Sequence, residues 1–128
     1  MFLNSSIIVE IITSEPGSPM VEKIFSHIEN ENLYISIIQL GELSDWCLKN
    51  AIDPMSIIPN LKNILTIHPL EERTILAGSV IKRTRRDDGH TKFTLLDGII
   101  FASSRELNEK LLTMDQDFTG MENVVVLT

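Results

Sequence analysis

Five short runs of β-prone apolar residues are the feature that most constrains how this chain can fold. The runs are "MFLN", "LYIS", "ILTI", "KLLTM" and "VVVL", and longer segments with helical spacing or helix-start signals lie between them. Strands that alternate with helices are typical of βαβ units, and the lack of strict polar alternation favours strands buried on both faces. The sequence therefore predicts an α/β fold with a mainly parallel sheet that is covered by helices on both sides.

Helix-start residues and apolar periodicity mark the expected helices. Ser5 and Ser6 are the expected caps of "SSIIVEIIT", and Ser18 precedes a proline at the first helical position of "SPMVEKIFSHIEN". Helices are also expected in "IIQLGELSDWCLKN", "DPMSIIPNLKNIL", "PLEERTILAGSVIKRTRR" and "LLDGIIFASSRELNE", and Pro59 is a potential break in the second of these. The apolar faces comprise Leu40, Leu43 and Cys47 in the third helix of the chain, and Leu70, Ile75, Leu76, Val80 and Ile81 in the fifth.

The length and composition of the chain predict one domain that spans residues 1–128. Apolar residues make up 43% of the chain, and no apolar run approaches the roughly 20 residues of a membrane span. The segment "MFLNSSIIVEIITSEP" has no basic region, so we interpret it as a strand and a helix and not as a signal peptide. A single cysteine excludes an internal disulfide and favours a reducing, cytoplasmic location.

The charge of the chain is acidic overall but includes one basic run. A formal net charge of −7 argues against a broadly basic protein that coats nucleic acid. It leaves room for an enzyme with a local basic patch, which Lys82, Arg83, Arg85 and Arg86 supply. The same cations also end a predicted helix, where they interact favourably with the helix dipole without any ligand.

Carboxylates are expected to gather at one edge of the predicted sheet. Asp115 follows the strand "KLLTM", and Asp97 begins the helix that leads back to that strand. Glu42 lies about two turns into the helix after "LYIS", and the first strand ends at position 4. Ligands of open parallel sheets bind at the carboxyl ends of the strands, and a hard divalent cation compensates the repulsion between clustered acids. This arrangement suggests metal-assisted phosphodiester chemistry.

Each of these acids also has a simpler interpretation when it is taken alone. Asp97 is then a helix cap, Asp115 or Asp117 a turn residue, and Glu42 a solvated helix residue. The three histidines, His27, His68 and His90, lack metal-ligand spacing and are interpreted as ordinary surface or loop residues. No glycine-rich nucleotide-binding motif is present in the sequence.

Four stretches of the chain, "MFLNSSIIVEII", "YISIIQLGEL", "LLDGIIFASS" and "KLLTMDQDF", together resemble the PIN-domain nucleases and in particular the VapC-type toxins. This resemblance implies a three-layer α/β/α sandwich with a five-stranded parallel sheet, and cleavage of RNA with Mg²⁺ or Mn²⁺. It also implies a homodimer and a small antitoxin partner, whose C-terminal segment typically lies across the active-site groove. The basic run would then contact RNA phosphates.

The resemblance assigns roles to individual acids and hydroxyls. Glu42, Asp97 and Asp115 match three acids of the family motif, and Asp117 matches an accessory acid. Ser5 matches the small hydroxyl residue that follows the first acid of the motif. Together with Thr113, it is expected to orient the metal ligands through hydrogen bonds.

Position 4 departs from the family pattern, because Asn4 stands where the family has aspartate. The amide keeps a carbonyl oxygen for a metal or its water, but it has lost the negative charge. Either the chain is a natural, degenerate member, or a parent chain was altered here to silence a toxic nuclease. In both cases we expect a weak or inactive ribonuclease, and the alternative function is a PIN-fold scaffold that binds RNA or an antitoxin without catalysis.

Overall fold

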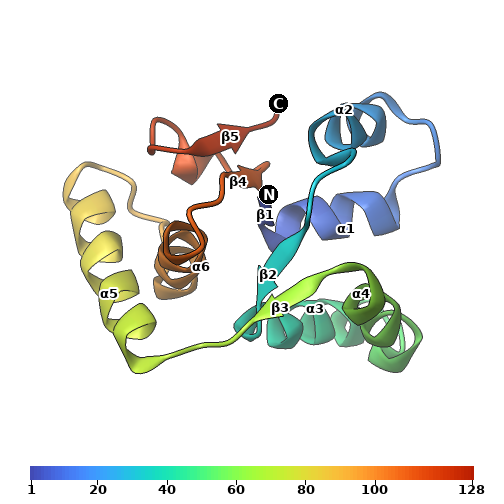
Figure 1. Ribbon diagram of the computed structural model, residues 1–128, viewed down its shortest axis with the longest axis horizontal. Helices are drawn as coiled ribbons and strands as arrows, with labels where there is room; N and C mark the ends of the chain where they lie inside the picture. The colour runs from blue at the N-terminus through green and yellow to red at the C-terminus, as the bar shows by residue number, and fades with distance from the viewer.

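One five-stranded sheet organises the computed structural model, which describes residues 1–128 (Figure 1). The strands are β1 (Phe2–Leu3), β2 (Tyr34–Ser36), β3 (Thr66–His68), β4 (Leu111–Thr113) and β5 (Val124–Val126). They lie in the order β3-β2-β1-β4-β5, and every neighbouring pair is parallel. The five predicted strands and the parallel sheet are therefore confirmed. β2 and β3 therefore lie on one side of β1, and β4 and β5 lie on the other.

Six α-helices and two short 3₁₀ turns connect the strands. The helices are α1 (Ser5–Thr13), α2 (Pro19–Ile28), α3 (Ile38–Lys49), α4 (Ile58–Ile64), α5 (Glu72–Asp87) and α6 (Leu95–Glu106). The 3₁₀ turns are η1 (Pro54–Ser56) and η2 (Gln116–Phe118). Pro59 lies in the first turn of α4, so the predicted break separates η1 from α4. None of the helices combines the length and the apolar character that a membrane crossing requires.

Apolar side chains project from both faces of the sheet, as expected for a three-layer α/β fold. Leu3 and Leu112 pack in one core with residues of α1, α2 and α3. Phe2 and Leu111, their neighbours in sequence, point to the other face and pack in a second core with α6 and Phe93. Each face of the sheet is therefore sealed by its own layer of helices.

The cap of α1 differs from the sequence-based expectation. Ser5 and Ser6 are already helical, and the N-cap is Asn4, whose side chain accepts a hydrogen bond from the Ser6 amide at 3.0 Å. An asparagine is as good a helix cap as serine, so propensity alone did not separate the three positions. At α2 the prediction is confirmed, because Ser18 caps the helix and a proline opens it.

Small residues make the closest contact between α5 and α6. Thr74 and Gly78 are the buried residues of α5, whereas Leu76 and Val80 are 59% and 65% exposed. Gly78 lies directly against the backbone of α6, where an added Cβ would stand 2.7 Å from the amide nitrogen of Ile99. The two helix backbones therefore touch, while the exposed Leu76 and Val80 face away from this contact and Ile81 packs against the second core.

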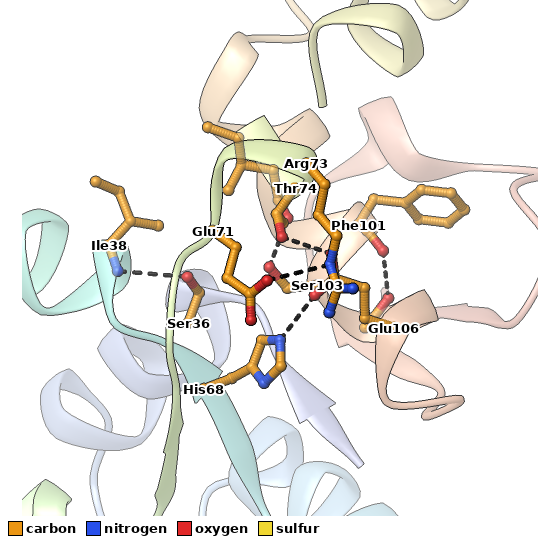
Figure 2. A network of polar contacts seen from close by, with 11 residues as sticks. Ser36, Ile38, His68, Glu71, Arg73, Thr74, Phe101, Ser103 and Glu106 are labelled. Atoms are coloured by element: carbon orange, nitrogen blue, oxygen red, sulfur yellow. Dashed lines mark hydrogen bonds and ion pairs between the residues drawn. The ribbon is translucent and has the colours of Figure 1, made fainter. Parts of the chain in front are cut away.

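A polar network fastens β3 to these two helices (Figure 2). His68, the last residue of β3, contacts Glu106 of α6 at 2.9 Å through Nε2, and the Thr74 hydroxyl donates to the same carboxylate at 2.5 Å. Burial raises the pKa of Glu106, but the bonds from Thr74 and His68 and the charge of Arg73 outweigh it and lower the pKa on balance. His68 thus has a structural partner that its sequence context did not reveal.

Candidate functional site

Two of the predicted site residues follow the central strands β1 and β4, where the strand order reverses. Asn4 follows β1 directly, and its backbone amide donates to the Leu112 carbonyl of β4 at 2.9 Å. Asn4 is buried, with 7% of the residue exposed. Asp115 lies two residues beyond β4 and caps η2 by accepting a bond from the Asp117 amide at 2.9 Å. A switch point of this kind is the usual ligand crevice of an open parallel sheet.

The first turn of α6 brings Asp97 to the same place. Thr94 and Asp97 form a capping box, with bonds of 2.8 and 3.1 Å between each side chain and the other residue's amide. Burial raises the pKa of Asp97, the bonds with Thr94 oppose this, and the charges of Asp115 and Asp117 raise it further. The charges of both acids in the segment after β4 therefore contribute to the raised pKa of Asp97.

Glu42 approaches from α3 and is held by a hydroxyl of α1. The Ser5 Oγ donates to Glu42 Oε1 at 2.9 Å. Burial raises the pKa of Glu42, the Ser5 bond opposes this, and the charge of Asp97 adds to the rise. Asp97 thus interacts electrostatically with Glu42 as well as with Asp115 and Asp117.

Gln39 organises this part of the site, and it was not predicted from the sequence. Its side chain is fully buried, and Nε2 donates to the Leu3 carbonyl at 2.8 Å and to Ser5 Oγ at 3.2 Å. Its Oε1 accepts from the Ser36 amide at 2.8 Å. Gln39 shares its four-residue register with the buried Leu43 and Cys47, whereas the expected Leu40 is only half-buried. A polar residue inside a buried helical stripe was the available signal.

Hydroxyl groups fix the backbone that carries Asp115. Thr113 Oγ1 accepts from the Asp115 amide at 3.0 Å, and Ser6 Oγ accepts from the Met114 amide at 3.1 Å. The two hydroxyl oxygens lie 3.5 Å apart. The turn after β4 is therefore anchored to α1, next to the cap formed by Asn4.

The acids offer suitable donors for a metal ion, although they do not stand ready in a ligand arrangement. No three acidic, histidine or cysteine side chains lie close enough together to hold an ion as they stand. One oxygen each of Glu42, Asp97 and Asp115 is engaged in the bonds described above, and the second oxygen of each carboxylate has no hydrogen bond. Hard carboxylate oxygens are the donors that a divalent cation prefers, so these acids fit such an ion, provided that the side chains move together.

The basic run divides into two structural groups. Arg85 turns inward and donates to backbone carbonyls of the segment after β4, so it is not a free cation. Lys82, Arg83 and Arg86 line a cavity of about 280 Å³ together with Ser79 and Leu95. Because Leu95 is the first residue of α6, this basic cavity lies beside the helix start that carries Asp97.

An apolar groove of about 260 Å³ opens elsewhere on the surface, and every residue that lines it is hydrophobic. Its walls come from α1, α2, α4 and adjoining strand residues. The lining residues are Leu3, Ile8, Ile11, Ile12, Phe25, Ile28, Leu33, Leu61, Ile64 and Leu65. Phe25 and Ile64 are exposed large side chains, which mark this groove as a surface that a partner can cover.

Comparisons with known proteins agree with this architecture. The family model of the PIN domain matches residues 1–123. A toxin–antitoxin complex from Klebsiella pneumoniae superposes with a TM-score of 0.74 at 16% identity, over 98% of this chain and 95% of that one. VapBC2 from Rickettsia felis, bound to a DNA fragment from its promoter, gives 0.73 at 20% identity, over 98% and 96%. FitAB bound to an IR36 DNA fragment gives 0.71 at 20% identity, over 98% and 92%. No curated protein matches the chain.

Proposed function

Because this chain belongs to the PIN-domain family, we propose that it is a metal-dependent endoribonuclease of the VapC toxin type that acts in the cytoplasm. PIN domains are generally nucleases, and the similar solved structures include a toxin–antitoxin complex and a VapBC protein. The observation that carries the proposal is the shared electrostatic environment of Glu42, Asp97 and Asp115, which come from three distant segments. Such mutual repulsion is a structural liability unless a cation relieves it.

In this proposal Glu42, Asp97 and Asp115 hold Mg²⁺ or Mn²⁺, and Asn4 and Asp117 supply further oxygens. The ion supplies an activated water and neutralises the charge that develops on the phosphoryl group. The protein contributes orientation, because Ser5 holds one oxygen of Glu42 and Thr113 fixes the Asp115 backbone. The exposed cations Arg83 and Arg86, with the half-buried Lys82, contact RNA phosphates beside the α6 start.

A titration with Mn²⁺ tests the metal site directly. Asp97→Asn is expected to weaken Mn²⁺ binding about 10- to 100-fold, as followed by electron paramagnetic resonance. Asp45→Asn, which removes an exposed carboxylate from α3, is the matched control and should leave the affinity unchanged. Equal affinities of the two variants, or Mn²⁺ density away from Glu42, Asp97 and Asp115 in a soaked crystal, would refute the site.

The pH dependence of this binding follows from the raised pKa values of Glu42 and Asp97. Mn²⁺ binds the ionised carboxylates, so its affinity should fall as the pH drops through these pKa values, above the ordinary 4.5 and 3.8. The stability of the metal-free protein should change in the opposite direction. Protonation of Glu42 and Asp97 relieves the buried repulsion and stabilises the folded state, and this stabilisation is lost as the pH rises through their raised pKa values. Denaturation with and without Mn²⁺ measures both trends.

We also propose that the apolar groove binds an apolar helix of a small antitoxin. The support is the groove itself and the three similar toxin–antitoxin structures. With the product of an adjacent small gene as the partner, Ile12→Asp should weaken the complex at least about 30-fold, whereas Thr13→Asp at the exposed end of α1 should not. Calorimetry measures the affinities, and equal values would exclude the groove. Light scattering of the chain alone tests the proposed homodimer.

Asn4 favours a second candidate, a PIN scaffold that has lost catalysis and binds RNA or an antitoxin. A neutral amide attracts Mg²⁺ far less than a carboxylate does, so the candidate site lacks one charge. Under this second function, the groove and the basic cavity keep their roles while restoring an acid at position 4 brings no cleavage. The variant discussed first below separates the two candidates.

A further inference from the structure

Arg85 occupies an unusual position for a cation in a basic run. Its Nη2 donates to the Asp117 carbonyl at 2.5 Å and to the Thr119 carbonyl at 3.0 Å. Its Nε is buried and has no hydrogen-bond partner, and its guanidinium carbon lies 5.9 Å from the centre of the Phe93 ring. The guanidinium is therefore directed into the protein, against the segment that follows Asp115.

The same end of α5 also holds the segment that precedes α6. Arg86 Nε donates to the Phe93 carbonyl at 2.8 Å, and Phe93 lies one residue before the Thr94 cap of α6. The Phe93 ring packs against Phe118 of η2, with their centres 5.1 Å apart. The start of α6 and the η2 turn thus meet each other and α5 at a single point.

We propose that Arg85 is a positioning residue that holds the Asp115–Thr119 segment at a set distance from Asp97. The backbone contact between Gly78 and Gly98 fixes α5 to α6, and Arg85 extends from this fixed helix to the carbonyls of Asp117 and Thr119. Together with the Phe93–Phe118 contact, this one side chain then helps to set the relative placement of the two acid-bearing turns. This inference rests on the proposed function only for the use of that placement, because the contact itself is independent of any metal.

This role separates Arg85 from its neighbour Arg83. Arg83 is exposed, with only a distant i,i+4 ion pair to Asp87 at 3.8 Å, and is free to meet a phosphate. Arg85 has committed its Nη2 to two backbone carbonyls, which a phosphate cannot replace without opening the turn. A lysine cannot replace it fully, because a compact ammonium lacks the planar guanidinium that lies over the Phe93 ring while it reaches the two carbonyls.

Three measurements on Arg85→Gln and Arg83→Gln test the proposal. Arg85→Gln is expected to speed hydrogen exchange of the amides in residues 115–119 about tenfold and to weaken Mn²⁺ binding about tenfold. Arg83→Gln should leave both the exchange rates and the Mn²⁺ affinity unchanged. It should instead reduce the slope of the logarithm of the RNA affinity against the logarithm of the salt concentration by about one. Arg85→Lys should give intermediate exchange, and it replaces Arg85→Gln if the latter fails to fold.

The outcomes divide cleanly between the two residues. Exchange and Mn²⁺ affinity in Arg85→Gln that match Arg83→Gln would overturn the positioning role. A reduced salt dependence in Arg85→Gln with unchanged exchange would also overturn it, and would make Arg85 an RNA contact. If the unaltered chain binds no Mn²⁺, the proposed function fails, and the exchange measurement alone still decides the role of Arg85.

Discussion

Replacing Asn4 with aspartate is expected to raise Mg²⁺-dependent RNA cleavage by about 100-fold, because the metal site regains a charged oxygen ligand. The fold should tolerate the change. Asn4 Oδ1 accepts a bond from the Ser6 amide, and a carboxylate oxygen accepts the same bond and interacts favourably with the start of α1. Cleavage of a labelled RNA by both chains, at matched Mg²⁺ concentrations, measures the effect.

The double variant Asn4→Asp with Asp97→Asn is the control for a contaminating ribonuclease, and it should cleave no faster than the unaltered chain. Equal, high activity of the unaltered chain and Asn4→Asp would show that position 4 does not limit catalysis. Absence of cleavage in both chains, with Mn²⁺ binding intact, would favour the binding scaffold.

Gly98→Ala is expected to lower the free energy of unfolding by about 3 kcal/mol, which is a large loss for a chain of this size. A Cβ at position 98 would overlap the Gly78 carbonyl oxygen and stand 2.9 Å from its carbonyl carbon. These are backbone atoms that no rotamer change can move, so α5 and α6 must separate. Urea denaturation measures the loss.

Gly41→Ala is the matched control, because Gly41 also lies inside a helix but has no atom within 4 Å of an added Cβ. The alanine there should stabilise the protein by up to about 1 kcal/mol through helix propensity. If both variants unfold at the same urea concentration, the close contact between α5 and α6 is not a determinant of stability.

Local signals were sufficient to predict most of the fold. The β-prone runs became strands, and Ser18, Pro59 and the start of α6 marked helix boundaries as expected. The inner face of α5 was not predictable from hydrophobicity, because two glycines on different helices make the contact. Such a contact depends on tertiary geometry, and the sequence of one helix carries no trace of its partner.

The candidate site was predictable in its acids and less so in its supporting residues. Glu42, Asp97 and Asp115 were identified from their expected places along the sheet edge, and their role as metal ligands remains a prediction. Gln39 and Arg85 required the structure, because both act through carbonyl groups of distant segments. Arg85 in particular was grouped with its neighbours by charge, although its surroundings separate it from them.

The helix caps at this site have a consequence for how the chemistry can be lost. Asn4, Asp97 and Asp115 each accept a bond from a backbone amide with a single oxygen, and an asparagine side chain can supply that oxygen as well as an aspartate can. An acid-to-amide exchange at position 97 or 115 therefore subtracts charge while the turn keeps its shape, and Asn4 already has this neutral form. Replacing one oxygen by a nitrogen at these positions removes a charge that catalysis needs and leaves the fold intact. A protein that has lost its nuclease activity in this way can therefore remain well folded.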